Sequence, residues 1–108
     1  SGESSAVIRE RVIRARNIQQ QRFKDDPHVH CNAQMSSRQL RQYAQLGPEA
    51  TEMLRAAMER LDLSARAYDR ILKVSRTIAD LDATSDIRVE HIAEAINYRN
   101  LDRSGWGQ

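Results

Sequence analysis

The stretch Leu63–Asp82, LSARAYDRILKVSRTIADLD, decides the fold class of this chain. Its apolar residues recur every three or four positions, which is the spacing of one face of an α-helix. Ser64 stands just before this pattern and belongs to the residue types that cap helix N-termini. We therefore predict a helix that begins after Ser64 and turns inward the side chains of Tyr68, Ile71, Leu72, Ser75, Ile78 and Leu81.

Arg66 lies in the first turn of this predicted helix, where a cation is disfavoured. The helix dipole places about half a positive charge at the N-terminus, so an arginine there costs about 0.3–1 kcal/mol. The placement becomes favourable when an anion such as a phosphate binds at the same end. Arg70 adds like charge one turn later, and Ala67 stands where a capping box has Glu. On these residues alone, a simple ion pair between Arg66 and Asp69 stays open as the alternative.

The composition predicts a single all-α domain. The chain has 108 residues, of which 30% are charged and 5% aromatic, and it contains only four glycines and two prolines. A sequence rich in Ala, Leu, Ile, Arg and Glu favours helices over sheets. The formal net charge is only +2, because acidic residues match most of the basic ones. The charge therefore does not by itself indicate a nucleic-acid-binding protein.

Cysteine content and hydropathy predict a cytoplasmic location. The single cysteine, Cys31, excludes an internal disulfide and is typical of a reducing compartment. No apolar run approaches the length of a transmembrane helix or a signal-peptide core, so we expect no membrane contact. The chain begins with SGESS and no methionine, which indicates a fragment of a longer protein.

Cap and turn residues divide the chain into about five helices that pack as a small bundle. We expect a domain over residues 1–103 and a flexible tail over residues 104–108. Ser36 and Gln39 have the spacing of a capping box, and Pro48 suits the first turn of a helix. The expected helices run from Ser4 or Ser5 to about Lys24, over Arg38–Ala44, from Pro48 through Leu61, over the stretch quoted above, and near Val89–Arg99.

Helical spacing also predicts which side chains the other helices bury. The segment Asp25–Met35 breaks the pattern and is expected to be a loop. The predicted buried positions are Ile8, Val12, Ala15 and Phe23 in the first helix, Ala50, Leu54, Ala57, Met58 and Leu61 in the helix that starts at Pro48, and Ile92, Ala93 and Ile96 in the last.

No complete catalytic set is present. The sequence has no Gly-rich phosphate loop, no GKS or GKT, no HExxH and no nucleophile elbow, so we expect no catalytic residue and no activity in this fragment alone. His28, His30 and Cys31 are zinc-competent residue types, but a structural zinc site needs four ligands. The only other histidine is His91. We interpret the segment as a polar exposed loop, with zinc as the weaker alternative.

The first predicted helix is basic, but its charges do not line one face. Glu10, Asp25 and Asp26 lie among them and dilute the charge. A solvated helix with ion pairs is the favoured interpretation, and a phosphate-backbone contact is the alternative. The basic residues are Arg9, Arg11, Arg14, Arg16, Arg22 and Lys24.

Four segments together resemble the C-terminal part of the magnesium-chelatase-like AAA+ ATPases, in the ComM/YifB competence-related branch. LSARAYDRILKVSRTIADLD carries the most specific likeness. The other three are GESSAVIRERVIRARNIQQQRF, similar to the family's entry helix; CNAQMSSRQLRQYAQL, similar to its connector; and IRVEHIAEAINYRNLDR, similar to its closing helix. The resemblance implies the small helical lid that follows the nucleotide-binding core.

The resemblance also implies a role for the arginine at the start of the central helix. Arg66 matches the sensor-2 arginine, which reaches the γ-phosphate of ATP bound to the core, and Arg70 is a possible supporting residue. ATP and Mg²⁺ are expected in the full-length protein and no cofactor in the isolated fragment. The expected partners are the core of the same parent chain, neighbouring subunits of a ring oligomer such as a hexamer, and DNA. The parent is expected to act in DNA branch migration or recombination during natural transformation.

Two other functions stay open. The domain is alternatively the lid of a chelatase-like motor that acts on metal insertion or protein remodelling. It is alternatively a free-standing helical module that binds DNA or protein. A GKS or GKT segment upstream in the same gene would exclude the free-standing module, because that segment would supply the nucleotide-binding core.

Overall fold

The computed structural model describes residues 4–101, which fold into five α-helices and one short 3₁₀ helix. In chain order these are α1 (Ser5–Arg22), η1 (Asn32–Gln34), α2 (Ser37–Tyr43), α3 (Pro48–Arg60), α4 (Ala65–Leu81) and α5 (Val89–Leu101). An isolated parallel bridge between Leu46 and Ile87 joins the segments that lead into α3 and α5. The all-α class is confirmed. The expected tail, residues 104–108, lies outside the described residues.

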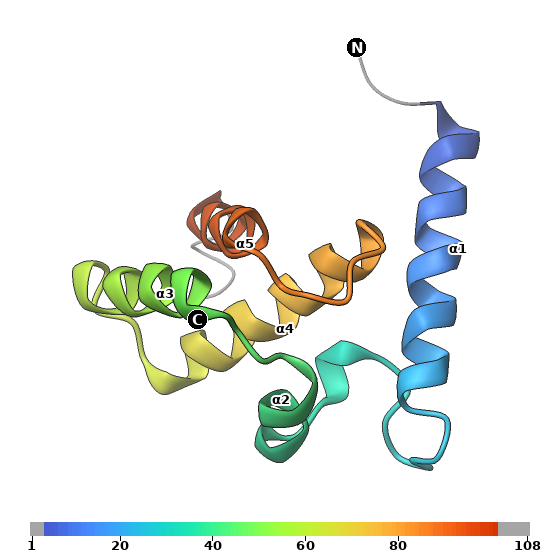
Figure 1. The fold of residues 1–108 in the computed structure, drawn as a ribbon, viewed down its shortest axis with the longest axis horizontal. Coiled ribbons are helices and arrows are strands. Elements are labelled where there is room, and N and C mark those ends of the chain that lie inside the picture. The colour runs from blue at the N-terminus through green and yellow to red at the C-terminus, as the bar shows by residue number, and fades with distance from the viewer. Residues whose placement is uncertain (1–3, 102–108) are drawn as a thin grey trace.

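Helix α4 is the centre of the bundle: α1, η1, α2 and α5 pack against it, and α3 packs against α5 (Figure 1). Its amphipathic pattern buries Ile71 and Ala79 completely, and they belong to the same core cluster as Ile92 of α5 and Leu54 of α3. Burial of each of the large side chains Ile71, Ile92 and Leu54 stabilises the fold by about 1.5–3 kcal/mol. The core is therefore built on the stretch that the sequence pattern picked out first.

Three predicted helix starts are confirmed. The Ser64 hydroxyl accepts a hydrogen bond from the backbone N–H of Ala67 at 3.1 Å and caps α4. Ser36 and Gln39 form a complete capping box at the start of α2, with Ser36 Oγ accepting from the Gln39 N–H at 3.2 Å. Pro48 occupies the first turn of α3. Each cap satisfies backbone N–H groups that lack a partner inside the helix.

Helices α3 and α4 end in the same way, each with a residue in the left-handed region. Asp62 has a φ of 51° and Ala83 a φ of 55°. In both, the next N–H reaches back to a carbonyl five residues earlier, Leu63 to Met58 at 3.1 Å and Thr84 to Ala79 at 3.0 Å. These are Schellman ends, in which glycine is the usual residue at the left-handed position.

Some expected burial positions were wrong. Ile8 and Val12 are 47% and 40% exposed, because the N-terminal half of α1 extends past the other helices (Figure 1). Tyr68 is 38% exposed at the edge of an open groove between α2 and α4. Ala93 is only half-buried, whereas its neighbour Ala95 is fully buried. The expected loop over residues 25–35 contains the short helix η1.

Candidate functional site

The start of α4 presents Arg66 to solvent. Ser64 caps the helix, and Arg66 is its second residue, with an exposed side chain. No acidic residue lies in this first turn. The side chain of Arg66 makes no hydrogen bond or ion pair with any residue between 4 and 101, so the alternative pairing with Asp69 is not formed. An exposed guanidinium with all five donors available can bind a phosphate through two parallel hydrogen bonds.

Two further basic residues continue this side of α4. Successive helix residues are turned by about 100°, so Arg70 and Lys73 lie within about 40° of Arg66 around the axis. Arg70 is exposed and Lys73 is half-buried. Arg70 was predicted as a possible supporting residue and Lys73 was not, although the spacing i, i+4, i+7 is visible in the sequence. The three cations form a basic row along the helix.

The groove beside α4 lies on a different side from this basic row. Tyr68 is two residues beyond Arg66, which turns it by about 160° the other way around the helix. Tyr68, Ala65 and Leu72 line the groove together with residues of α2, and its volume is about 700 Å³. Arg66 is not among the residues that line this groove, although Asp69, turned by about 60° from it, is one of them.

A buried polar cluster joins α1, η1 and α4. Both terminal nitrogens of Arg22 donate to the carboxylate of Asp80, each at 2.8 Å. Asn32 donates from its side-chain amide to Asp80 Oδ2 at 2.8 Å and to the Thr77 hydroxyl at 3.0 Å. Its backbone N–H donates to Gln19 Oε1 at 2.9 Å. Asp80 and Asn32 are 0% and 1% exposed, so this cluster fixes how α1 is held against the body.

Arg76 is the second cation of the cluster. It lies 3.3 Å from Asp80 and donates to the backbone carbonyls of Tyr43, Thr84 and Ser85 at 2.9–3.2 Å. Burial lowers the pKa of Arg76, and the Asp80 carboxylate opposes that shift. The carbonyl groups compensate part of the buried positive charge. Helical periodicity gives no sign that Arg76 and Asp80 are buried, so neither was predicted as a site residue. Only the segment that contains Asn32, CNAQM, belongs to a motif noted in the sequence.

The His28, His30 and Cys31 side chains do not form a recognisable metal centre. Both histidines are exposed, Cys31 is half-buried, and no group of three metal-ligating side chains comes together within residues 4–101. The segment around these residues is a loop, as expected. The Asp26 carboxylate stabilises it by accepting hydrogen bonds from the His28 backbone N–H at 2.8 Å and from the Gln39 side-chain amide at 2.9 Å. These bonds, led by that from the His28 N–H, lower the pKa of Asp26.

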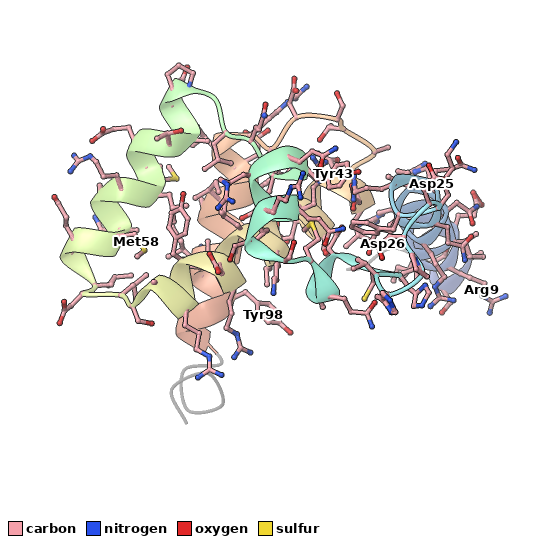
Figure 2. The ribbon with its side chains drawn as sticks, turned by 90° about the horizontal axis from the view of Figure 1, so that it is seen from below. Arg9, Asp25, Asp26, Tyr43, Met58 and Tyr98 are labelled. Atoms are coloured by element: carbon pink, nitrogen blue, oxygen red, sulfur yellow. The ribbon has the colours of Figure 1, made fainter. Side chains whose placement is uncertain are left out.

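The arginines of α1 differ in their burial. Arg22 belongs to the buried polar cluster, whereas Arg9, Arg14 and Arg16 are exposed. Figure 2 shows Arg9 pointing away from the rest of the molecule. The interpretation of α1 as a solvated helix with ion pairs is therefore incomplete, because the ion pair in its last turn is buried.

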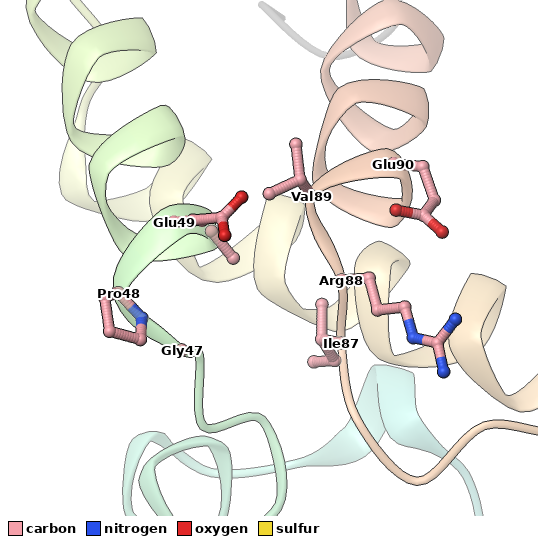
Figure 3. A pocket seen from close by; sticks show the side chains of 8 residues that line it. Gly47, Pro48, Glu49, Ile87, Arg88, Val89 and Glu90 are labelled. Carbon is pink, nitrogen blue, oxygen red and sulfur yellow. The ribbon is translucent and has the colours of Figure 1, made fainter.

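A second open hollow lies between the starts of α3 and α5. Figure 3 shows Gly47 and Pro48 on one side and Ile87 to Glu90 on the other. Its volume is about 340 Å³, and its charged lining residues are Arg88 and the carboxylates Glu49 and Glu90. Two carboxylates beside one cation do not favour an anion, so the basic row of α4 stays the better candidate site for a phosphate.

A comparison with protein-family models shows which family the chain belongs to. The model described as magnesium chelatase, subunit ChlI C-terminal, matches residues 2–99. The chain belongs to this family. It is 42% identical over 102 residues to the competence protein ComM of Haemophilus influenzae and, equally, to the uncharacterized protein YifB of Escherichia coli. An uncharacterized protein of Mycobacterium tuberculosis is 35% identical over 99 residues.

These relatives are much longer than the matched segment. The alignments cover 94% of this chain for ComM and YifB and 91% for the mycobacterial protein, but only 19% of each relative. The chain is thus a ChlI C-terminal domain of a ComM/YifB-type protein, as the resemblance predicted. Within residues 4–101, no helix is long and apolar enough to cross a membrane.

Proposed function

We propose that this domain is the sensor-2 lid of an ATP-dependent AAA+ motor. In this proposal Arg66 contacts the γ-phosphate of ATP that is bound to the nucleotide-binding core of the same parent protein. Arg70 supports that contact from the next turn of α4. The domain has no activity alone, because the residues that bind and activate the nucleotide belong to the core.

One observation carries the proposal: Arg66 is exposed at the capped start of α4 and has no partner among the described residues. Arginines near helix ends normally lie at the C-terminus, where the dipole favours a cation. Arg66 lies at the opposite end, where an arriving phosphate would be bound both by the guanidinium and by the dipole. The electrostatic cost of the free domain would then become a gain in the bound state.

The residues of this domain fit a terminal phosphate but not a magnesium ion. A phosphate needs donors, and Arg66 offers them in a fixed planar arrangement. Mg²⁺ needs oxygen ligands in an octahedral set, and no acidic cluster of that kind lies within residues 4–101. In the parent, Mg²⁺ would therefore be held by the core, where it would neutralise phosphate charge. The part played by this chain is to bind and orient the terminal phosphate.

The proposed role of the parent is DNA branch migration or recombination during natural transformation, in a cytoplasmic ring oligomer such as a hexamer. The likeness to a protein named competence protein ComM supports this role. The family description, which refers to magnesium chelatase, favours the alternative of a motor for metal insertion or protein remodelling. Stimulation of the parent's ATP hydrolysis by branched DNA would separate the two, since a chelatase-type motor is not expected to respond to DNA.

The sensor role is tested with Arg66→Ala in the full-length parent. ATP turnover is expected to fall by about tenfold or more, because a phosphate-contacting arginine stabilises developing charge. Arg66→Lys is expected to recover little, since an ammonium lacks the two parallel donors. The isolated domain is expected to bind ATP weakly or not at all.

Arg38→Ala is the matched control. Arg38 is the second residue of α2, follows the N-cap Ser36 and is exposed, so it repeats the local position of Arg66 at another helix. Its replacement is expected to leave ATP turnover unchanged. Equal turnover in the Arg66→Ala and native proteins would remove the sensor role, and equal losses for both variants would point to a general effect of helix-start arginines.

A further inference from the structure

The N-terminal half of α1 exposes an unusual amount of apolar surface. Four of the six large hydrophobic side chains that are exposed within the described residues lie in two turns of this helix. They are Val7, Ile8, Val12 and Ile13, with exposed fractions of 46%, 47%, 40% and 48%. Single exposed apolar residues are ordinary on a protein surface, but a contiguous group marks an interaction site.

The other half of α1 is firmly anchored. Ala15 and Phe23 are buried, and the Arg22–Asp80 pair with Asn32 fixes the C-terminal end of the helix to α4. Figure 1 shows the N-terminal half running on past α4 and α5. An isolated helix of this kind is marginal in water, because most helical stability comes from tertiary packing. The projecting half is therefore held in one direction by its base while its own side chains have little to pack against.

Three of the four exposed apolar side chains, those of Ile8, Val12 and Ile13, lie on one side of the helix. At about 100° per residue, Ile8, Val12 and Arg16 lie along one line of the helix, and Arg9 and Ile13 lie along the next. We call these five residues the outer face of α1. Ile8 lies within about 20° of the line of the buried Ala15, and Ile13 is turned by about 160° from it, so the face extends from the anchored side of the helix to the far side. Figure 2 shows Arg9, on this face, pointing away from the body.

The charge of residues 7–16 limits which kind of partner can bind the outer face of α1. Residues 7–16 contain four arginines and one glutamate, so two copies of this helix would bring like charges together. A nucleic-acid backbone would satisfy Arg9 and Arg16 but would leave the isoleucine and valine side chains against phosphates and sugars. The face instead fits a protein surface that is apolar at its centre and carries carboxylates opposite the two arginines.

We propose that the outer face of α1 docks onto the part of the parent protein that precedes this domain. The relatives extend over about five times the matched length, the family is defined as a C-terminal one, and α1 is the first element of the chain. The face thus lies next to the point where the preceding part joins. The proposal rests on the proposed function only in identifying that part as the nucleotide-binding core.

Docking through α1 would give α4 a fixed relation to the core. The buried pair Arg22–Asp80 joins the two helices at one point, and Arg66 lies at the far end of α4. The outer face, the buried cluster and the basic row would then form one rigid path. In this proposal the basic row of α4 could bind a phosphate only if the outer face of α1 is docked onto the preceding part of the parent.

The test is limited trypsin digestion of the full-length parent without nucleotide. Trypsin cleaves after arginine, and cleavage after Arg9 and Arg16 requires local opening of α1. The double variant Ile8→Gln/Ile13→Gln keeps good helix formers but removes the apolar contacts. It is expected to raise cleavage at these two sites by about tenfold. Unchanged cleavage would overturn the proposal.

Val7→Gln is the matched control, because Val7 has the same exposure on the same helix but lies off the outer face. It is expected to change cleavage little, and an equal increase would overturn the assignment of the face. Protection that is lost on dilution would identify a second copy as the occupant and overturn docking within one chain. If protection behaves as expected while Arg66→Ala leaves ATP turnover intact, the docking face stands and the sensor role falls.

Discussion

Arg22 binds Asp80 through two parallel hydrogen bonds of 2.8 Å, although 58 residues separate them in the chain. The side chains are 11% and 1% exposed, so the pair lies inside the protein. The pair joins α1 to α4. Arg22 also donates to the side-chain oxygen of Asn32, and Asp80 also pairs with Arg76. The orientation of α1 therefore depends on a buried charge cluster as well as on apolar packing.

Asp80→Ala is expected to lower the free energy of unfolding by about 3–5 kcal/mol, because it leaves two buried arginines without their carboxylate. Urea denaturation measures this loss. Asp62→Asn serves as the control, since Asp62 is exposed and asparagine tolerates its left-handed backbone. In a double-mutant cycle, Arg22→Met should cost less in the Asp80→Ala background than in the native protein. Additive costs would mean that the two side chains do not interact.

Arg66→Ala is expected to have the opposite effect on stability. Removing a cation from the N-terminal turn of α4 should raise the free energy of unfolding by about 0.3–1 kcal/mol. Arg60 lies in the last turn of α3, where the dipole favours a cation, so Arg60→Ala should lower stability by a similar amount. Thermal melts of the two variants at low salt make the comparison. A loss of stability in Arg66→Ala would show that the side chain has a structural contact in the free domain.

The hydrogen bonds of the Asp26 carboxylate predict that the stability of the domain falls at low pH. Its carboxylate binds the His28 N–H and the Gln39 amide, so its folded-state pKa lies below the unfolded value. The stabilising contribution is present above the ordinary aspartate pKa of about 3.9 and is lost as the pH falls through the lowered one. The stability difference between the native protein and Asp26→Asn should therefore shrink between pH 6 and pH 3, as measured by denaturation at each pH. Asp25→Asn, at the exposed neighbouring position, should show little difference at either pH.

The hydrogen bonds of His91 predict that its Nδ1 accepts and its Nε2 carries a proton in the folded state. Its Nδ1 lies 2.9 Å from the Arg88 N–H, which must donate, and its Nε2 lies 3.1 Å from Asp82 Oδ2. Nitrogen NMR shifts of the ring report the tautomer directly, and a proton on Nδ1 would contradict this assignment. His91→Ala should cost about 1–3 kcal/mol, since it leaves the N–H at the start of α5 without its acceptor. His30→Ala, at an exposed position, is the comparison.

The helix starts and the core could be predicted because their signals are local. The Ser36–Gln39 capping box and the Ser64 cap depend on residues three apart, and the buried residues Ile71 and Ile92 follow helical spacing. The exposure of Ile8 could not be predicted in this way. Periodicity shows that a side chain lies on an apolar face, but not whether another element is long enough to cover it.

The polar cluster was not predictable from the pattern for a related reason. Arg76 and Asp80 have the i, i+4 spacing of an exposed ion pair, and nothing nearby in sequence indicates that Arg22 and Asn32 pack over them. By contrast, the place of Arg66 in the first turn of α4 could be inferred locally, because the Ser64 cap fixes where the helix begins. The role of Arg66 stays a prediction until the parent is assayed.

The left-handed end of α4 offers a site for stabilisation. Ala83 adopts a backbone conformation that costs a residue with a Cβ atom about 1–2 kcal/mol and costs glycine nothing. Glycine would lose part of that gain through the greater freedom of its unfolded chain. Ala83 follows the C-terminus of α4, at the opposite end from Arg66, and is not part of the outer face of α1. Glycine at this position is therefore expected to give a more stable domain for laboratory work without changing the residues that the proposals assign to binding.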